Sequence, residues 1–249
     1  MKSKLMLGAM LALTLSTGAA YAKPTPAMEA AVADKGRPEA DTKRDADRKP
    51  AEMLDFAGIK PGMVVGDFLP GGGYFTRIFA KAVGPKGKVL AITNPPPANA
   101  TTPPPIIAIA ADPQYGNITL VSTGIGSFKL PEKVDVMWTS QNYHDLYLTR
   151  FNLDVPAVTK EIYDAIKPGG VFIVLDHRAA DGAPVKETAN TLHRIDPASV
   201  RKTVEAAGFK YEGESKVLAN PADDHTKGVF DPALRGHTDQ FIYKFRKPK

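Results

Sequence analysis

The sequence predicts an α/β fold: a three-layer sandwich with a mostly parallel, seven-stranded sheet and an antiparallel edge strand. Two observations predict this fold. From Met63 onward, short apolar runs alternate with segments that carry apolar residues at helical spacing, which is the order of parallel strands joined by crossover helices. The apolar runs also contain almost no polar residues, which is typical of strands that are covered on both faces.

The strands and helices follow in order along the chain. Short, mostly apolar runs predict five strands, at residues 63–68, 88–93, 118–122, 134–139 and 171–175. Two more strands, at residues 211–218 and 240–245, are expected to close the chain. Apolar residues at helical spacing predict helices at residues 52–56, 74–83, 155–166 and 197–207. No helical pattern separates the last two strands, so we expect them to form an antiparallel pair at one edge of the sheet.

A proline-rich stretch and two large aromatic residues add to this prediction. Prolines at 95–97 and 103–105 bracket a short polar stretch after the second strand. This density of proline favours extended backbone over helix, at the place where a crossover helix would normally start. Trp138 and Phe172 fall inside predicted strands, and we expect both in the core.

The N-terminus predicts an export signal. Lys2 and Lys4 precede a short apolar run at residues 5–15, and Ala20-Tyr21-Ala22 fits a signal-peptidase site, so residues 1–22 are expected to be removed. The apolar run is too short to span a bilayer. The prediction is therefore a periplasmic or secreted protein with no stable membrane insertion after cleavage.

The mature chain is expected to have two parts. Residues 23–49 are polar and predict a surface arm with a short helix near residues 27–33, while residues 50–249 form the α/β domain. The chain has no cysteine, which excludes disulfides and thiolate metal sites. The full sequence has a net charge of +5, which becomes +3 without Lys2 and Lys4, and its basic residues are scattered, so we expect no nucleic-acid partner. The oligomeric state stays open.

A glycine turn follows the first strand. Asp67 lies near the end of that strand. Gly71, Gly72 and Gly73 form the turn, and Tyr74 begins the next helix. Glycines let the backbone approach a ligand, and the helix N-terminus offers free N–H groups. The Lys-Ser/Thr pair of a phosphate loop is absent, and Asp67 would repel a pyrophosphate. An acid at this position suits a cofactor with a positive end and no phosphate, such as S-adenosylmethionine.

Asp67 with Gly71 and Gly73 resembles the first motif of class I S-adenosylmethionine-dependent methyltransferases, although Leu69 stands where the first glycine of that motif belongs. Residues 166–173 and 206–209 resemble the segments before the fifth and sixth strands of that family, and the resemblance extends over residues 50–245. It is closest to a group of exported, predicted methyltransferases that carry the segments at residues 48–52, 70–77, 142–145 and 192–196.

The resemblance implies a Rossmann-like fold that binds S-adenosylmethionine. The residues expected to bind this cofactor are Asp67, Leu69, Gly71, Gly72, Gly73, Tyr74 and Asn94. In the family, an acid at the end of the second strand usually binds the ribose hydroxyls. Here Thr93 and Asn94 occupy that place, and Asn94 would make a weaker, uncharged hydrogen bond.

Two polar clusters follow the fourth and fifth strands, where the family takes its substrate-facing residues. Methyl transfer needs a deprotonated nucleophile, so a positioned base is required. The candidate catalytic groups are His144 oriented by Asp145, or His177 beside Asp176. Asn142 and Tyr143 are the candidates for holding a small-molecule substrate.

Three functions are consistent with these residues. The first is methyl transfer from S-adenosylmethionine to a small molecule. The second is a methyltransferase-fold binding protein of the cell envelope that has lost the reaction, which Leu69 and the missing ribose acid favour. The third is a metal-assisted hydrolase in which His144, His177 and Asp176 converge. Since the sequence contains no H-x-x-x-H or H-E-x-x-H pair, we assign no metal ligands.

One further histidine and one long loop remain to be placed from the sequence. His193 precedes a predicted helix start at Asp196-Pro197 and is expected to be a surface or packing residue. The long polar segment at residues 220–239 is expected to be either a lid over the site or a solvated loop at the sheet edge.

Overall fold

The computed structural model describes residues 24–249, so the predicted export signal lies outside the described residues. Its seven strands form one sheet in the order β3-β2-β1-β4-β5-β7-β6. All neighbouring strands are parallel except β5–β7 and β6–β7, which confirms the predicted antiparallel edge. The strands are β1 (Val64–Phe68), β2 (Lys88–Thr93), β3 (Ile118–Ser122), β4 (Val134–Ser140), β5 (Ile166–His177), β6 (Lys210–Ser215) and β7 (Gln240–Arg246).

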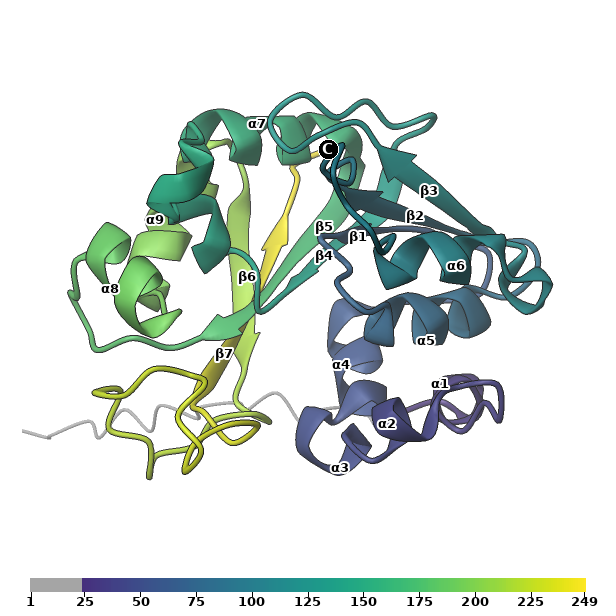
Figure 1. The fold of residues 1–249 in the computed structure, drawn as a ribbon. Coiled ribbons are helices and arrows are strands. Elements are labelled where there is room, and N and C mark those ends of the chain that lie inside the picture. Colours follow the sequence, from purple (N-terminus) through teal and green to yellow (C-terminus); the bar gives the residue numbers. More distant parts are fainter. Residues whose placement is uncertain (1–23) are drawn as a thin grey trace, which may run out of the picture.

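Helices cover both faces of the sheet, as Figure 1 shows. One layer contains α1 (Pro26–Val32), α4 (Pro50–Ala57), α5 (Tyr74–Val83) and α6 (Pro105–Ala111). The opposite layer contains α7 (Val155–Ala165) and α9 (Pro197–Ala206), with α8 (Val185–Leu192) beside them. The predicted three-layer sandwich is therefore confirmed. Among residues 24–249, no helix combines the length and the apolar character that crossing a bilayer requires.

Local signals in the sequence explain where the helices begin and end. Asp154 accepts a hydrogen bond from the backbone N–H of Ala157 at the start of α7, over 3.1 Å. Asp196 caps α9 in the same way, followed by a proline in the first turn. Gly58 ends α4 with a φ of 72°, a left-handed conformation that glycine adopts at little cost.

Three elements differ from the sequence expectation. Helix α6 starts at Pro105 and ends the extended stretch, because proline is tolerated in the first turn of a helix. Helix α8 was not predicted, since its buried residues are only Thr188 and Ala189 and it carries no apolar stripe. Strand β5 begins at Ile166 rather than Val171, because Ile166 pairs with Val134 before the ladder is interrupted.

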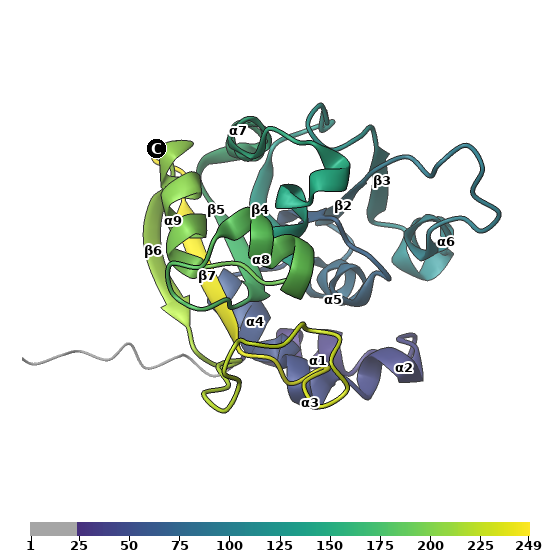
Figure 2. The same ribbon diagram turned by 60° about the vertical axis from the view of Figure 1, so that its left-hand side comes forward.

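The expected surface arm is part of the packed layer. It contains α1 and the short helices α2 (Glu39–Thr42) and α3 (Asp45–Arg48), and Figure 2 shows them beside α4 and α5. Met28 and Ala31 belong to the same core cluster as α5. Asp45 accepts hydrogen bonds from Arg37 at 2.6 and 2.8 Å and from the Tyr74 hydroxyl at 2.6 Å. The polar residues of this segment therefore form ion pairs and hydrogen bonds that fasten it to the domain.

The core on this face is centred on Trp138 of β4, which is fully buried. Its ring lies 4.8 Å from that of Phe75 and 5.4 Å from that of Phe79, both on α5. On the opposite face of the sheet, Phe172 of β5 is also fully buried. The prediction that both residues lie in the core is confirmed.

Candidate active site

The turn after β1 is strained at the position where the sequence departs from the glycine-rich motif. Leu69 has a φ of 60°, a left-handed conformation that costs a residue with a Cβ roughly 1–2 kcal/mol. This backbone geometry explains why a glycine is expected at that position. The side-chain amide of Asn142 donates hydrogen bonds to the carbonyls of Leu69, over 2.8 Å, and of Ser140, over 2.7 Å. Asn142 thus ties the ends of β1 and β4 together.

A cavity of about 420 Å³ opens at the carboxyl ends of β1, β2 and β4. Its size is in the range of small-molecule binding sites. In a sheet of this kind, ligands bind at this edge. The cavity is lined by Leu69, Gly71, Thr93, Asn94, Ile125, Asn142, Asp145, Leu146, Phe151 and Leu153. Five of the residues expected at the site therefore lie where a ligand would contact them: Leu69, Gly71, Asn94, Asn142 and Asp145.

The other residues expected to bind the cofactor do not line this cavity. Asp67 is buried under the turn, where it accepts a hydrogen bond from the Thr76 hydroxyl over 2.6 Å. Gly72 is exposed on the turn, and a Cβ at Gly73 would collide with Ile109 of α6. Tyr74 faces the N-terminal helices, since its hydroxyl donates to Asp45. These four residues shape the turn and its packing.

Burial raises the pKa of Asp67 to about 7, although the hydrogen bond from Thr76 and the charge of Arg48 act in the opposite direction. Because the pKa is higher in the folded protein, the folded state holds a proton that the unfolded state releases as pH rises above about 4. The stabilisation from this proton is complete below that pH. It is lost as pH rises through the folded pKa of about 7.

The Asp67→Asn variant is expected to remove this pH dependence. Asparagine cannot ionise, and its carbonyl oxygen still accepts from Thr76. Between about pH 4 and pH 8, the free energy of unfolding of the variant should rise relative to wild type by roughly 2–4 kcal/mol. Urea unfolding across this range measures the difference. An Asp181→Asn control, whose side chain is 93 % exposed, should follow wild type. Parallel profiles for wild type and Asp67→Asn would contradict the expectation.

His144 and Asp176 form a buried pair at the ends of β4 and β5. The Nδ1 atom of His144 lies 2.8 Å from one oxygen of Asp176, and the His144 backbone N–H donates to the other over 2.8 Å. Burial alone would lower the pKa of His144, but the charge and hydrogen bond of Asp176 outweigh it and raise the pKa. Burial alone would raise the pKa of Asp176, but the charge and hydrogen bonds of His144, together with the charge of His177, outweigh it and lower the pKa. Asp176 is thus the residue that orients His144.

Two predicted site residues point elsewhere. His177 bonds the Thr238 hydroxyl through Nδ1 over 2.7 Å, and burial lowers its pKa to about 3, so its ring is neutral at pH 7. Tyr143 was expected to hold the substrate, but it is fully buried and its hydroxyl lies 2.8 Å from that of Thr159. That expectation is corrected: Tyr143 is a core residue beneath the site.

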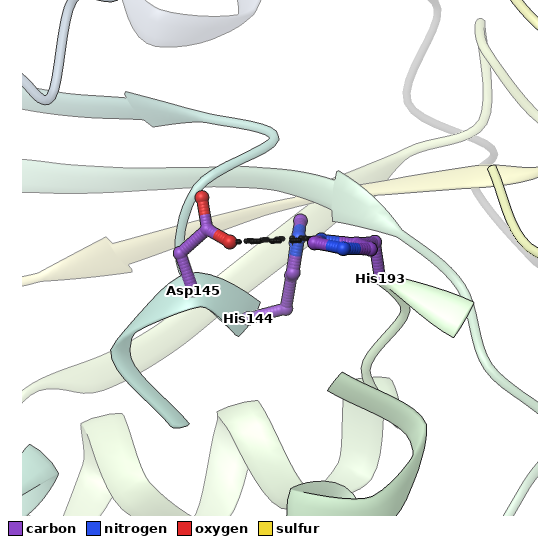
Figure 3. Close-up of side chains that lie close together, drawn as sticks. All are labelled: His144, Asp145 and His193. Carbon is purple, nitrogen blue, oxygen red and sulfur yellow. Dashed lines mark hydrogen bonds and ion pairs between the residues drawn. The ribbon is translucent and has the colours of Figure 1, made fainter. Parts of the chain in front are cut away.

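His193, expected to be a surface or packing residue, joins the site. Its Nδ1 lies 3.4 Å from Nε2 of His144 and 3.7 Å from Oδ1 of Asp145 (Figure 3). His193 ends α8 with a φ of 53°, which turns the chain back toward β5. A bridge between Arg178 and Ile195 holds the segment there. Sequence spacing gave no signal for this contact, because α8 itself was not predicted.

Arg48 reaches the site from the N-terminal segment. It donates a hydrogen bond to the Ser140 hydroxyl at the end of β4 over 2.9 Å. Its guanidinium lies 4.3 Å from the centre of the Tyr74 ring. Burial lowers the pKa of Arg48 to about 10, so it stays charged at neutral pH. The sequence predicts residue 48 in the surface arm, and no pattern of residues indicates this contact.

The long polar segment at residues 220–239 borders the same edge of the sheet. It is anchored by a fully buried ion pair between Arg194 and Asp223, with an N–O distance of 2.9 Å. Arg194 also donates to the carbonyls of Lys227 and Arg178, over 2.8 and 2.9 Å. Phe230 of this segment is 63 % exposed, and its ring centre lies 5.0 Å from that of His193. The segment is a fastened loop with one apolar side chain at the site.

Comparisons with known proteins identify the fold. No family model and no curated protein matches the sequence. Among solved structures, the chain is similar to a SAM-dependent methyltransferase from Aquifex aeolicus, with 19 % identity over 84 % of this chain and 95 % of that one and a TM-score of 0.58. It is also similar to an arsenic(III) S-adenosylmethionine methyltransferase from Chlamydomonas reinhardtii, with 19 % identity, coverage of 91 % and 74 %, and a TM-score of 0.56.

A third structure with this fold is the [4+2]-cyclase SpnF, with 18 % identity, coverage of 86 % and 85 %, and a TM-score of 0.59. The strand order, the glycine turn and these similarities together define the class: the chain has the Rossmann-like fold of class I S-adenosylmethionine-dependent methyltransferases. The fold that the sequence predicted is therefore confirmed.

Proposed function

We propose that the protein is an S-adenosylmethionine-dependent methyltransferase that acts on a small molecule outside the cytosol. The observation that carries the proposal is the cavity of about 420 Å³ at the ends of β1, β2 and β4, beside the His144–Asp176 pair. The similarity of the protein's fold to those of solved methyltransferases supports S-adenosylmethionine as the cofactor. The proposed location outside the cytosol depends on the export signal that the sequence predicts at residues 1–22.

The lining of the cavity suits an adenosyl group with a charged tail. Asn94 accepts a hydrogen bond from the Ile125 backbone N–H over 2.8 Å through its carbonyl oxygen, which leaves its amide N–H₂ to donate to a ribose hydroxyl. Gly71 and Leu69 offer backbone at the turn. Thr93 and Ile125 complete the wall near Asn94 with a hydroxyl and an apolar surface.

His144 is the proposed general base. Its Nδ1 is held by Asp176, so Nε2 is the atom left to accept a substrate proton, and it lies 3.4 Å from Oδ1 of Asp145, which lines the cavity. The negative charge of Asp176 raises the proton affinity of His144, which strengthens it as a base. Asp176 is then a positioning residue, and Asn142 holds the turn.

The proposal is tested by calorimetric titration of the protein with S-adenosylmethionine and by two substitutions at one position. The Asn94→Asp variant keeps an acceptor for Ile125 and gains a second, charged acceptor for a ribose hydroxyl. We expect it to bind the cofactor up to about 10-fold more tightly, or about 1.4 kcal/mol. The Asn94→Ala variant should bind about 10-fold more weakly.

A Gln114→Glu variant is the control, because it makes the same chemical change at an exposed residue that does not line the cavity. It should bind like wild type. Absence of S-adenosylmethionine binding by wild type at millimolar concentration would overturn the methyltransferase proposal and favour a binding protein that shares only the fold. Binding that both Asn94 variants leave unchanged would show that the cofactor occupies another site.

A further inference from the structure

Three atoms that could bind a metal ion converge beside the cavity (Figure 3). Nε2 of His144 lies 3.4 Å from Nδ1 of His193 and 3.4 Å from Oδ1 of Asp145, and the last two atoms are 3.7 Å apart. The three residues come from two separate segments, the turn after β4 and the end of α8. Their convergence therefore depends on the tertiary fold.

The other ring nitrogen of His144, Nδ1, already has a hydrogen-bond partner. The Asp176 carboxylate only accepts hydrogen bonds, so Nδ1 of His144 carries the proton that joins them over 2.8 Å. In the neutral ring, Nε2 then presents a lone pair. It faces a carboxylate oxygen of Asp145, which is also an acceptor, and the ring of His193. A carboxylate that bonds the far nitrogen of a histidine is the usual support of a metal-binding histidine.

We propose that His144, Asp145 and His193 bind one divalent transition-metal ion of the zinc type. An ion displaced by about 0.6 Å from the plane of the three atoms, as tetrahedral coordination requires, would lie about 2.1 Å from each of them, which matches zinc–nitrogen and zinc–oxygen bond lengths of about 2.0–2.2 Å. Ligands of a tetrahedral zinc ion lie about 3.3–3.4 Å apart, and neighbouring ligands of an octahedral ion of the same bond length lie about 3.0 Å apart. The observed separations favour the four-coordinate geometry.

Three protein ligands leave the fourth position open. The side chains of Asp145 and His193 are each 26 % exposed, whereas that of His144 is 4 % exposed, so the ion would sit between a buried anchor and solvent. Asp145 also lines the cavity. The open position therefore admits water or an oxygen, nitrogen or sulfur atom of a small molecule in that cavity. Three protein ligands with one open place are typical of catalytic rather than structural zinc sites.

This assignment replaces two expectations from the sequence. No metal ligands were assigned, and the hydrolase alternative grouped His144 with His177 and Asp176. In the structure His177 bonds Thr238, and Asp176 binds the far side of the His144 ring. Asp145 and His193 take their places. The metal site stands on this geometry and does not depend on binding of S-adenosylmethionine. It uses the same Nε2 atom that serves as the proposed general base in the metal-free protein, so with an ion bound His144 is a ligand, and a metal-bound hydroxide in the open position would take the substrate proton instead.

The test is a titration of the purified, chelator-treated full chain with Co²⁺, followed by displacement with Zn²⁺. We expect one ion per chain and the intense visible absorption of four-coordinate Co²⁺, lost when Zn²⁺ is added. The His193→Ala and Asp145→Ala variants should each weaken Zn²⁺ binding by about 100-fold or more, since loss of a partner of a ligand alone costs about 10–100-fold. The His237→Ala variant, whose side chain is 64 % exposed, should bind like wild type.

Circular dichroism of each variant shows that its fold is retained, which is expected because both replaced side chains are partly exposed. No binding of Co²⁺ or Zn²⁺ by wild type at millimolar concentration would overturn the proposal. Binding that survives both substitutions would overturn it as well, because the ion would then lie elsewhere. Titration of the same metal-free protein with S-adenosylmethionine separates this result from the methyltransferase proposal.

Discussion

The Asp176→Asn variant is expected to lose about 3–5 kcal/mol of unfolding free energy. Asp176 is fully buried and accepts three hydrogen bonds, from the backbone N–H groups of His144 and His177 and from Nδ1 of His144. An asparagine has one acceptor oxygen, and its N–H₂ group would face at least one of these donors in either orientation. The variant therefore leaves buried donors unsatisfied and removes the charge that His144 faces.

Urea unfolding measures this loss, with Asp164→Asn as the control. Asp164 pairs with Lys160 on the surface of α7 and its side chain is 61 % exposed, so the control should change stability by less than about 0.5 kcal/mol. A second readout is the NMR titration of the His144 ring. Without the Asp176 carboxylate, the charge of Asp145 is the remaining influence that opposes burial, so the pKa of His144 should fall below its wild-type value. A variant as stable as wild type with an unchanged His144 titration would contradict the assigned role.

The Arg194→Met variant should lose a similar amount, about 3–5 kcal/mol. Both side chains of the Arg194–Asp223 pair are fully buried, so removal of the cation leaves an unpaired carboxylate inside the protein. The two backbone carbonyls that Arg194 binds also lose their donor. Methionine fills much of the vacated volume, so the loss measures charge and hydrogen bonding more than packing.

Two comparisons make this test specific. The Lys43→Met variant removes an exposed surface pair with Glu39 and should cost less than about 0.5 kcal/mol. The double variant Arg194→Met/Asp223→Asn should recover part of the loss, since the buried charge is gone. Hydrogen exchange in residues 220–239 should become faster in the single variant, because Arg194 fastens that loop. A loss no larger than that of Lys43→Met would show that the pair contributes little.

The fold was predictable because its signals are local. Short, mostly apolar runs marked the five parallel strands β1 to β5, and glycines and prolines marked where helices begin and end. The misses have physical causes. Helix α8 buries only Thr188 and Ala189, so the sequence has no apolar stripe that would predict a helix there. The N-terminal helices are polar because they are fastened by ion pairs such as Arg37–Asp45, which composition alone does not distinguish from solvated charges.

The candidate site was only partly predictable. The rule that strand ends meet at one edge of a parallel sheet placed Asn94, Asn142 and Asp145 at the cavity. It does not say which way a side chain turns, so Tyr74 and Tyr143 were assigned to ligands that they do not face. His193 and Arg48 come from segments whose paths depend on tertiary packing, and no spacing in the sequence links either to the site.

The packing around Trp138 gives the protein a built-in optical probe. It is the only tryptophan in the sequence, so its fluorescence comes from one known environment. The indole is fully buried, sits beside Asp67 in the register of β1 and β4, and touches the helix that begins at the glycine turn. A shift of its emission on adding a ligand would therefore report rearrangement near the turn without any label, and the large red shift on unfolding would come from a single site.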